Sequence, residues 1–274
     1  MRTEQAVAKP APPHPAVSTA RVAATALLAL ATALLTGAAA ANGAQLPPPL
    51  IPHEAEYRVS RGPLTLGRSV TTLEPADGGW EYRTVVTATG AARLLVSGQA
   101  VERTLLESDG TALRTLRYQH TRPNDGGSAH VEFAWDHHQA YIDNDDGEMV
   151  VPLAADQHDP HGAILTVVIA LARDGSVPSF AILDDDGDIT RLNFHTEAGG
   201  TIRVPYGEFD TVKVTRIRED RDRQLIAWFA PELDWLPVRI TQIDEGSTVA
   251  RMDLRRLDGD SGSSTIQRRP GDRR

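Results

Sequence analysis

The sequence of 274 residues contains no cysteine. Disulfide bonds, thiolate metal sites, cysteine nucleophiles and a lipidated N-terminal cysteine are therefore excluded. Lysine is also scarce, because Lys213 is the only one beyond residue 41. A Schiff-base lysine needs a desolvated amine, whereas Lys213 lies in a run of alternating apolar and polar residues. We therefore expect Lys213 on a strand surface.

Positive charge is in deficit, since 28 Lys+Arg oppose 37 Asp+Glu and give a formal net charge of −9. Phosphate binding requires a basic surface, so we expect no nucleic-acid partner. The motifs G-x-S-x-G, S-x-x-K and H-E-x-x-H are missing as well. The sequence therefore offers no catalytic residue, and we expect a protein that is not an enzyme. Apolar residues make up 41% of the chain, which is enough for a buried core.

The first 41 residues have the three parts of a secretory signal. Arg2, Lys9 and Arg21 give a basic start, an uncharged apolar run follows, and small residues end it at Ala41. We predict cleavage after Ala41, with Ala44 as the alternative site, export to the periplasm and no stable membrane span afterwards. An N-terminal membrane anchor is the alternative, because the run 22–41 is about long enough to span a bilayer.

The rest of the chain divides into three parts. Residues 42–52 are rich in proline and predict an extended linker, since proline blocks the hydrogen bonds of helices and strands. Residues 258–274 are rich in Asp, Gly, Ser and Arg and predict a disordered tail. Residues 53–257 between them predict a single β-rich domain.

Apolar and polar residues alternate through much of this domain. Val131 and Phe133, for example, alternate with His130 and Glu132. Side chains of a strand point to opposite faces in turn, so the pattern predicts strands with one wet and one dry face. Turn sequences with glycine, such as residues 77–79, separate these runs at short intervals. We predict about a dozen strands in a meandering antiparallel sheet.

Residues 159–173 predict a helix instead. Asp159 and Pro160 suit a helix start, and Arg173 and Gly175 suit its end. Several β-branched residues in the segment favour a strand as the alternative. The helix would be apolar all round apart from one threonine, and such a helix must be covered on every side. We therefore predict a mostly β fold, in which a large curled antiparallel sheet, an open or incomplete barrel, wraps one apolar helix.

The order of several segments resembles the bacterial exported proteins grouped as domain-of-unknown-function family 3108. The segments are residues 55–59, 66–67, 88–95, 116–118, 159–172, 204–214 and 228–240, of which the last two are the most specific. The resemblance covers residues 50–257 and implies a mostly β periplasmic protein, with no catalytic residue to carry over. The inferred shape is also similar to the lipoprotein-carrier folds of the periplasm, an architectural analogy that does not define a function.

Two acidic segments, residues 143–147 and 184–188, place carboxylates as oxygen-ligand cations require. Asp-Gly is also a common hairpin turn, so we predict turns there. His158 and His161, together with residues 137–138, form a second candidate metal set. A helix start and a hairpin tip explain these histidines equally well. We therefore predict no metal and no cofactor.

A curled sheet around a helix encloses an apolar lumen, which the helix fills or a ligand enters. Aromatic and aliphatic residues expected on the inner face are the candidate ligand-lining set, and core packing is the alternative for each. The set is Phe133, Trp135, Ile164, Val168, Trp228, Trp235 and Leu236.

The function predicted from the sequence is binding of an apolar or amphipathic, lipid-like ligand in maintenance of the cell envelope. One alternative is an assembly scaffold with a filled core, which pairs a sheet edge with another envelope protein. A less favoured one is a hydrolase of envelope polymers, because paired carboxylates are recognised only in the fold. An apolar cavity on the order of a few hundred Å³ would favour the ligand, and a filled core the scaffold.

Overall fold

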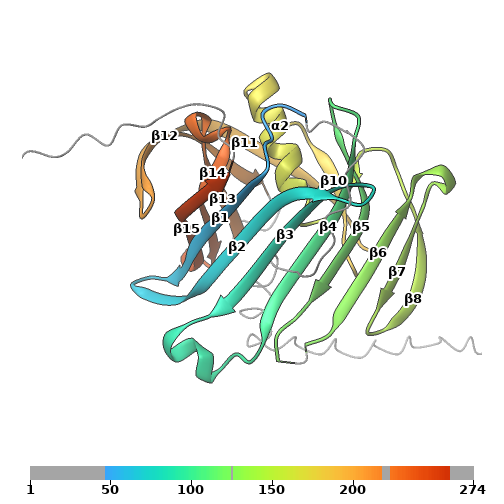
Figure 1. Cartoon of the computed structure of the whole chain (residues 1–274), viewed down its shortest axis with the longest axis horizontal. Helices are drawn as coiled ribbons and strands as arrows, with labels where there is room; N and C mark the ends of the chain where they lie inside the picture. Colours follow the sequence, from blue (N-terminus) through green and yellow to red (C-terminus); the bar gives the residue numbers. More distant parts are fainter. Residues whose placement is uncertain (1–46, 125, 218–222, 260–274) are drawn as a thin grey trace, which may run out of the picture.

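The computed structural model describes residues 47–259, except for residue 125 and residues 218–222. The described residues form fifteen strands in one sheet, in the order β8-β7-β6-β5-β4-β3-β2-β1-β15-β14-β13-β12-β11-β10-β9. The sheet curls around helix α2 (Figure 1). In the strand order, β8 and β9 are its two ends. The predicted mostly β fold, a curled sheet around one apolar helix, is confirmed.

The first half of the sheet is a meander in which each strand pairs antiparallel with the next. Its strands are β1 (His53–Arg61), β2 (Leu64–Ala76), β3 (Gly79–Ala88), β4 (Gln99–Ser108), β5 (Leu113–Thr121), β6 (Ser128–Ala134), β7 (Gln139–Asn144) and β8 (Gly147–Pro152). Short 3-10 helices lie in two of the connections, η1 (Gly90–Leu94) after β3 and η2 (Trp135–His137) after β6.

The second half begins with a strand–helix–strand unit and continues as a meander. Its elements are β9 (Gln157–His158), α2 (Ala163–Asp174), β10 (Phe180–Leu183), β11 (Ile189–Val204), β12 (Gly207–Ile217), β13 (Arg223–Ala230), η3 (Pro231–Leu233), β14 (Leu236–Asp244) and β15 (Ser247–Gly259). β9 pairs parallel with β10, so the expectation of a purely antiparallel sheet is wrong at this pair. The parallel pairing arises because α2 carries the chain back to the starting end of β9.

The predicted helix is present but starts later than expected. Its N-cap is Gly162, so the expectation of Asp159 as N-cap is wrong. The Asp159 carboxylate instead accepts hydrogen bonds from the backbone N–H groups of His161 (3.0 Å) and Gly162 (2.7 Å), which stabilises the turn before the helix. The predicted end is confirmed, because Gly175 is left-handed (φ 67°) and its N–H bonds to the carbonyl of Leu171.

Side chains on every face of α2 are buried or half-buried as far as Ala172. Leu165, Val168 and Leu171 are almost completely covered and pack in the largest core cluster, with residues from both halves of the sheet. Full burial of such a side chain contributes about 1.5–3 kcal/mol. The curled sheet thus explains how a helix without a polar face is stable.

The two halves of the sheet join where β1 pairs with β15. The buried carboxylate of Asp253 on β15 contacts three guanidinium groups there: Arg239 on β14 at 2.5 Å, Arg251 at 2.8 Å and Arg58 on β1 at 3.3 Å. An unpaired buried carboxylate would cost several kcal/mol of folding free energy, and the three arginines offset this cost for Asp253. The result is a tie across β1, β14 and β15.

The ends of the domain differ slightly from the predicted boundaries. Leu50, within the predicted linker 42–52, is buried in the core cluster around α2. Strand β15 runs to Gly259, two residues into the predicted tail 258–274. The predicted signal, residues 1–41, and the remainder of the tail lie outside the described residues. Within the described ranges, no helix has the length and hydropathy of a transmembrane span.

Candidate ligand-binding site

An apolar cavity of about 240 Å³ lies between the first half of α2 and the sheet. Ala163, Ile164 and Val167 line it from the helix, and most of the opposing residues are apolar. The polar residues on its wall are His161, Arg216 and Gln242. We call it the helix cavity. A dry cavity of about 150 Å³ is enough to bind benzene, so the helix cavity has room for a larger apolar group.

A second cavity of about 250 Å³ lies beside the helix cavity. Leu50, Val168 and Leu236 contribute apolar surface to it, while Glu232 and Asp234 make its wall partly acidic. We call it the rim cavity. Ile164 of α2 lines both cavities, so this one side chain lies between them. The placement of α2 therefore determines the shape of both.

A chain of buried hydrogen bonds anchors the start of α2. Thr104 donates to the Asp159 carboxylate at 2.8 Å, so the N–H of His161 Nδ1 donates to Thr104 at 2.9 Å. His161 Nε2 is then the acceptor for the hydroxyl of Thr84 at 3.0 Å, and Thr84 accepts from Thr71 at 2.9 Å. This chain ties β2, β3 and β4 to the turn before the helix.

His161 is one of the polar residues that line the helix cavity, and its imidazole is neutral. Burial lowers the pKa of His161 to about 3. Both ring nitrogens are occupied by hydrogen bonds to threonines, and the ring stacks on Tyr82. Burial raises the pKa of Tyr82, so its hydroxyl is neutral too. The two hydrogen bonds and the ring stacking hold the imidazole in one orientation, and this fixes the start of the helix.

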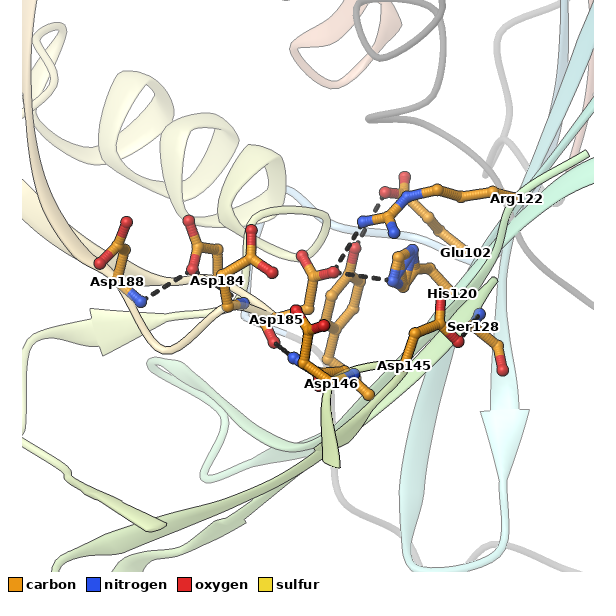
Figure 2. A network of polar contacts seen from close by, with 12 residues as sticks. Glu102, His120, Arg122, Ser128, Asp145, Asp146, Asp184, Asp185 and Asp188 are labelled. Carbon is orange, nitrogen blue, oxygen red and sulfur yellow. Dashed lines mark hydrogen bonds and ion pairs between the residues drawn. The ribbon is translucent and has the colours of Figure 1, made fainter. Parts of the chain in front are cut away.

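The two acidic segments meet on one side of the sheet. Figure 2 shows the carboxylate of Asp185, in the β10–β11 turn, facing His120 of β5 and Arg122, the residue that follows β5. Its carboxylate lies 2.7 Å from Arg122 and 3.0 Å from His120, and its carbonyl accepts a hydrogen bond from Asn144 at 2.7 Å. Burial lowers the pKa of His120, although Asp185 acts in the opposite direction. We call this group the Asp185 clasp.

Both acidic segments are turns, as predicted. Asp184 accepts hydrogen bonds from the N–H groups of Asp186 and Asp188, and Asn144 accepts one from that of Asp146. These bonds use the side-chain oxygens within the turns themselves. Among the described residues, no group of three or more His, Asp or Glu side chains is placed to hold a metal ion.

The histidines of the candidate metal set take up separate positions. His161 is buried under α2, while His158 lies edge-on to Phe180 at the end of β9. Residues 137–138 form the connection between β6 and β7, as the predicted hairpin tip requires. Lys213 makes a surface ion pair with Glu197 at 2.8 Å, in agreement with its predicted surface position.

The seven predicted ligand-lining residues are divided among three clusters of the described core. Ile164, Val168 and Leu236 line the helix cavity or the rim cavity. The remaining four pack within the clusters and line neither of these cavities; they are Phe133, Trp135, Trp228 and Trp235. Trp135, for example, donates its indole N–H to the carbonyl of Thr115 at 2.7 Å.

The wall of the helix cavity opposite α2 was not predicted from the sequence. Phe180 and Ile182 of β10, with Leu192 and Phe194 of β11, line the helix cavity. The signals were present, because Leu192 and Phe194 alternate with polar residues and Phe180 opens a short apolar run after the helix. The sequence does not show that the chain returns through α2 and pairs β10 parallel with β9.

The family model described as a protein of unknown function, DUF3108, matches residues 56–255. The chain belongs to this family. The matched range runs from β1 to β15 and includes α2 and the walls of the helix cavity. The membership predicted from the order of segments is thus confirmed.

Two solved structures are similar to the chain. One is a β-barrel-like protein of family DUF1849 from Brucella abortus, with 12% identity and a TM-score of 0.46, covering 77% of this chain and 99% of that chain. The other is a candidate lipoprotein from Parabacteroides distasonis, with 12% identity and a TM-score of 0.31, covering 78% of this chain and 97% of that chain. No curated protein matches the chain.

Proposed function

We propose that this protein binds an apolar or amphipathic ligand between α2 and the curled sheet and does not alter it chemically. The observation that supports this is the helix cavity, about 240 Å³ in volume and lined mostly by apolar side chains. Binding sites for small molecules are typically concave and apolar, with a few polar groups that fix orientation. Arg216 and Gln242 are such groups here, whereas both ring nitrogens of His161 are already bonded to threonines.

The cavity volume limits the part of the ligand that is enclosed. It exceeds the roughly 150 Å³ that holds benzene but is below the roughly 300–1,000 Å³ of sites for drug-sized molecules. A ring or a segment of one acyl chain fits these limits, with the rest of the molecule outside. Arg216, one of the lining residues, carries a positive charge that favours an amphipathic ligand with an anionic group.

We place this activity in the periplasm, in maintenance of the cell envelope. The support is the signal predicted in residues 1–41 and the resemblance of the domain to exported proteins. An assembly scaffold is the alternative, with β8 as the pairing edge. That alternative predicts a filled core, whereas two cavities flank Ile164 in the described structure. The ligand-binding function is therefore the better supported one.

The test is displacement of a fluorescent fatty-acid probe from delipidated protein, with mass spectrometry of lipids retained from an envelope extract. The variant Val167→Phe fills the helix cavity. We expect it to weaken probe binding roughly tenfold, because the added ring occupies space that the apolar part of the probe would fill. Val150→Phe, on the exposed surface of β8, is the matched control and should bind like the parent. Circular dichroism verifies that both variants fold. The proposal fails if the parent binds no probe and retains no lipid, or if Val167→Phe binds as well as the parent.

A further inference from the structure

Two neighbouring loops at one end of the sheet expose large apolar side chains. Leu94 and Leu95, at the end of η1, are 87% and 82% exposed, and Leu64, at the β1–β2 turn, is 58% exposed. They are the three most exposed large apolar side chains of the described residues. The loops lie side by side, because the N–H of Thr89 bonds to the carbonyl of Leu66 at 2.9 Å. Figure 1 shows both loops projecting at the lower left of the molecule.

We call residues 61–65 and 89–98 together the leucine tip. Its charge is opposite to that of the chain as a whole, which has 37 acidic and 28 basic residues. The sequence has no acidic residue between Glu56 and Glu74, and none between Glu81 and Glu102. Arg61 and Arg93 lie on the tip itself and are exposed. The tip is therefore a cationic apolar projection on an acidic protein.

Exposed leucines beside arginines match one kind of surface in particular. Apolar side chains on a membrane-bound element enter the boundary between headgroups and acyl chains, and arginine is attracted to anionic headgroups. A protein partner would need a groove shaped to two separate convex loops, whereas a bilayer accepts protruding side chains in any arrangement. We propose that the leucine tip docks the protein onto an anionic lipid surface, with Leu64, Leu94 and Leu95 inserted.

The leucine tip lies next to the helix cavity. Val59, two residues before Arg61, and Val86, three residues before Thr89, both line that cavity. Docking by the tip therefore brings the cavity close to the bilayer, where an apolar chain moves between the two with little exposure to water. This role in ligand exchange rests on the proposed function, while the docking itself does not.

Co-sedimentation with vesicles tests the docking. One set contains equal parts phosphatidylglycerol and phosphatidylcholine, and the other contains phosphatidylcholine alone. We expect the chain without the predicted signal, residues 42–274, to bind the anionic set. The double variant Leu94→Glu, Leu95→Glu should bind at least tenfold more weakly. Val150→Glu introduces the same charge at a 54% exposed apolar position on β8 and should bind like the parent. Arg61→Ser with Arg93→Ser should weaken binding roughly tenfold, since each arginine near an anionic surface contributes.

The outcomes separate this inference from the proposed function. No binding of the parent to anionic vesicles overturns the docking, as does unchanged binding of the leucine double variant. Equal binding to the two vesicle sets overturns the part assigned to the arginines. The leucine double variant should keep the parent's affinity for the fatty-acid probe in solution. If the parent binds vesicles but no probe, the docking stands and the proposed function falls.

Discussion

The imidazole of His161 stacks on the ring of Tyr82, with ring centroids 4.5 Å apart and an angle of 24° between the planes. Tyr82 lines the rim cavity, and His161 lines the helix cavity. The stacked pair therefore joins the walls of the two cavities and fixes the start of α2 on β3. A change in this pair should alter stability and cavity shape together.

The first prediction concerns pH. The pKa of His161 is about 3 in the folded protein, against 6.5 in the unfolded chain. Between these values the unfolded chain binds more protons than the folded protein. The contribution of His161 to the free energy of unfolding is therefore complete above pH 6.5 and is lost as the pH falls toward 3. The slope approaches about 1.4 kcal/mol per pH unit. Urea unfolding of the parent and of His161→Gln between pH 7 and pH 5 measures this contribution.

His161→Gln should show the shallower dependence of unfolding free energy on pH. Burial also lowers the pKa of His53, His120, His130 and His158, and these groups act in the same direction in both proteins. The difference between the two slopes therefore isolates His161. Identical slopes would show that the buried imidazole is protonated as readily as in the unfolded chain.

The second prediction concerns the hydroxyl of Thr104, which joins His161 to Asp159. Thr104→Val keeps the shape and leaves a buried N–H and a carboxylate oxygen each short of one partner. We expect a loss of about 1–3 kcal/mol in unfolding free energy. Thr121→Val, at an exposed position of β5, should stay within about 0.5 kcal/mol. Equal effects at the two positions would contradict the network.

The third prediction concerns Gly162, whose φ of −68° suits any residue. A methyl group added there would lie 2.5 Å from Oδ2 of Asp159 and 3.1 Å from Cγ2 of Thr104. Gly162→Ala should therefore destabilise the protein by about 1–3 kcal/mol, and alanine is also less favourable than glycine at an N-cap. Thermal and urea unfolding measure the change. A stabilised variant would mean that the Asp159 carboxylate moves aside easily.

The fourth prediction concerns the Asp185 clasp. Asp185→Asn keeps the size of the side chain but removes the charge that faces Arg122 and His120. We expect a loss of about 1–2 kcal/mol, at the low end for charged hydrogen bonds because Arg122 is partly exposed. Hydrogen exchange should accelerate at residues 184–188 and in the β7–β8 turn. Asp156→Asn, which breaks the exposed pair with Arg191, should have an effect close to zero.

Several features could be predicted from the sequence because they depend on local patterns. Alternation predicts the strands, Asp-Gly pairs predict the turns, and Gly175 predicts the helix end. The wrapping of α2 follows from the same kind of reasoning, since a helix such as residues 163–172 has no side that tolerates water. These inferences need only the chemistry of near neighbours along the chain.

The features that could not be predicted depend on register. Bulges shift the pairing of β1 with β15 after Glu56 and of β13 with β14 after Trp228, and each shift changes which side chains meet. The three arginines at Asp253 come from three strands, so no local motif announces them. The division of Trp228 and Trp235 between two clusters has the same origin.

The pairing of β1 with β15 sets an order of events for the newly made chain. His53 pairs with Gly259, so β1 cannot complete its pairing with β15 until the last strand of the domain has been made. Contacts between such distant residues form slowly, because a long loop must close first. A chain emerging in the N-to-C direction from a ribosome or a translocation channel can complete its N-terminal meander, but the two halves of the sheet unite only after synthesis has passed residue 259.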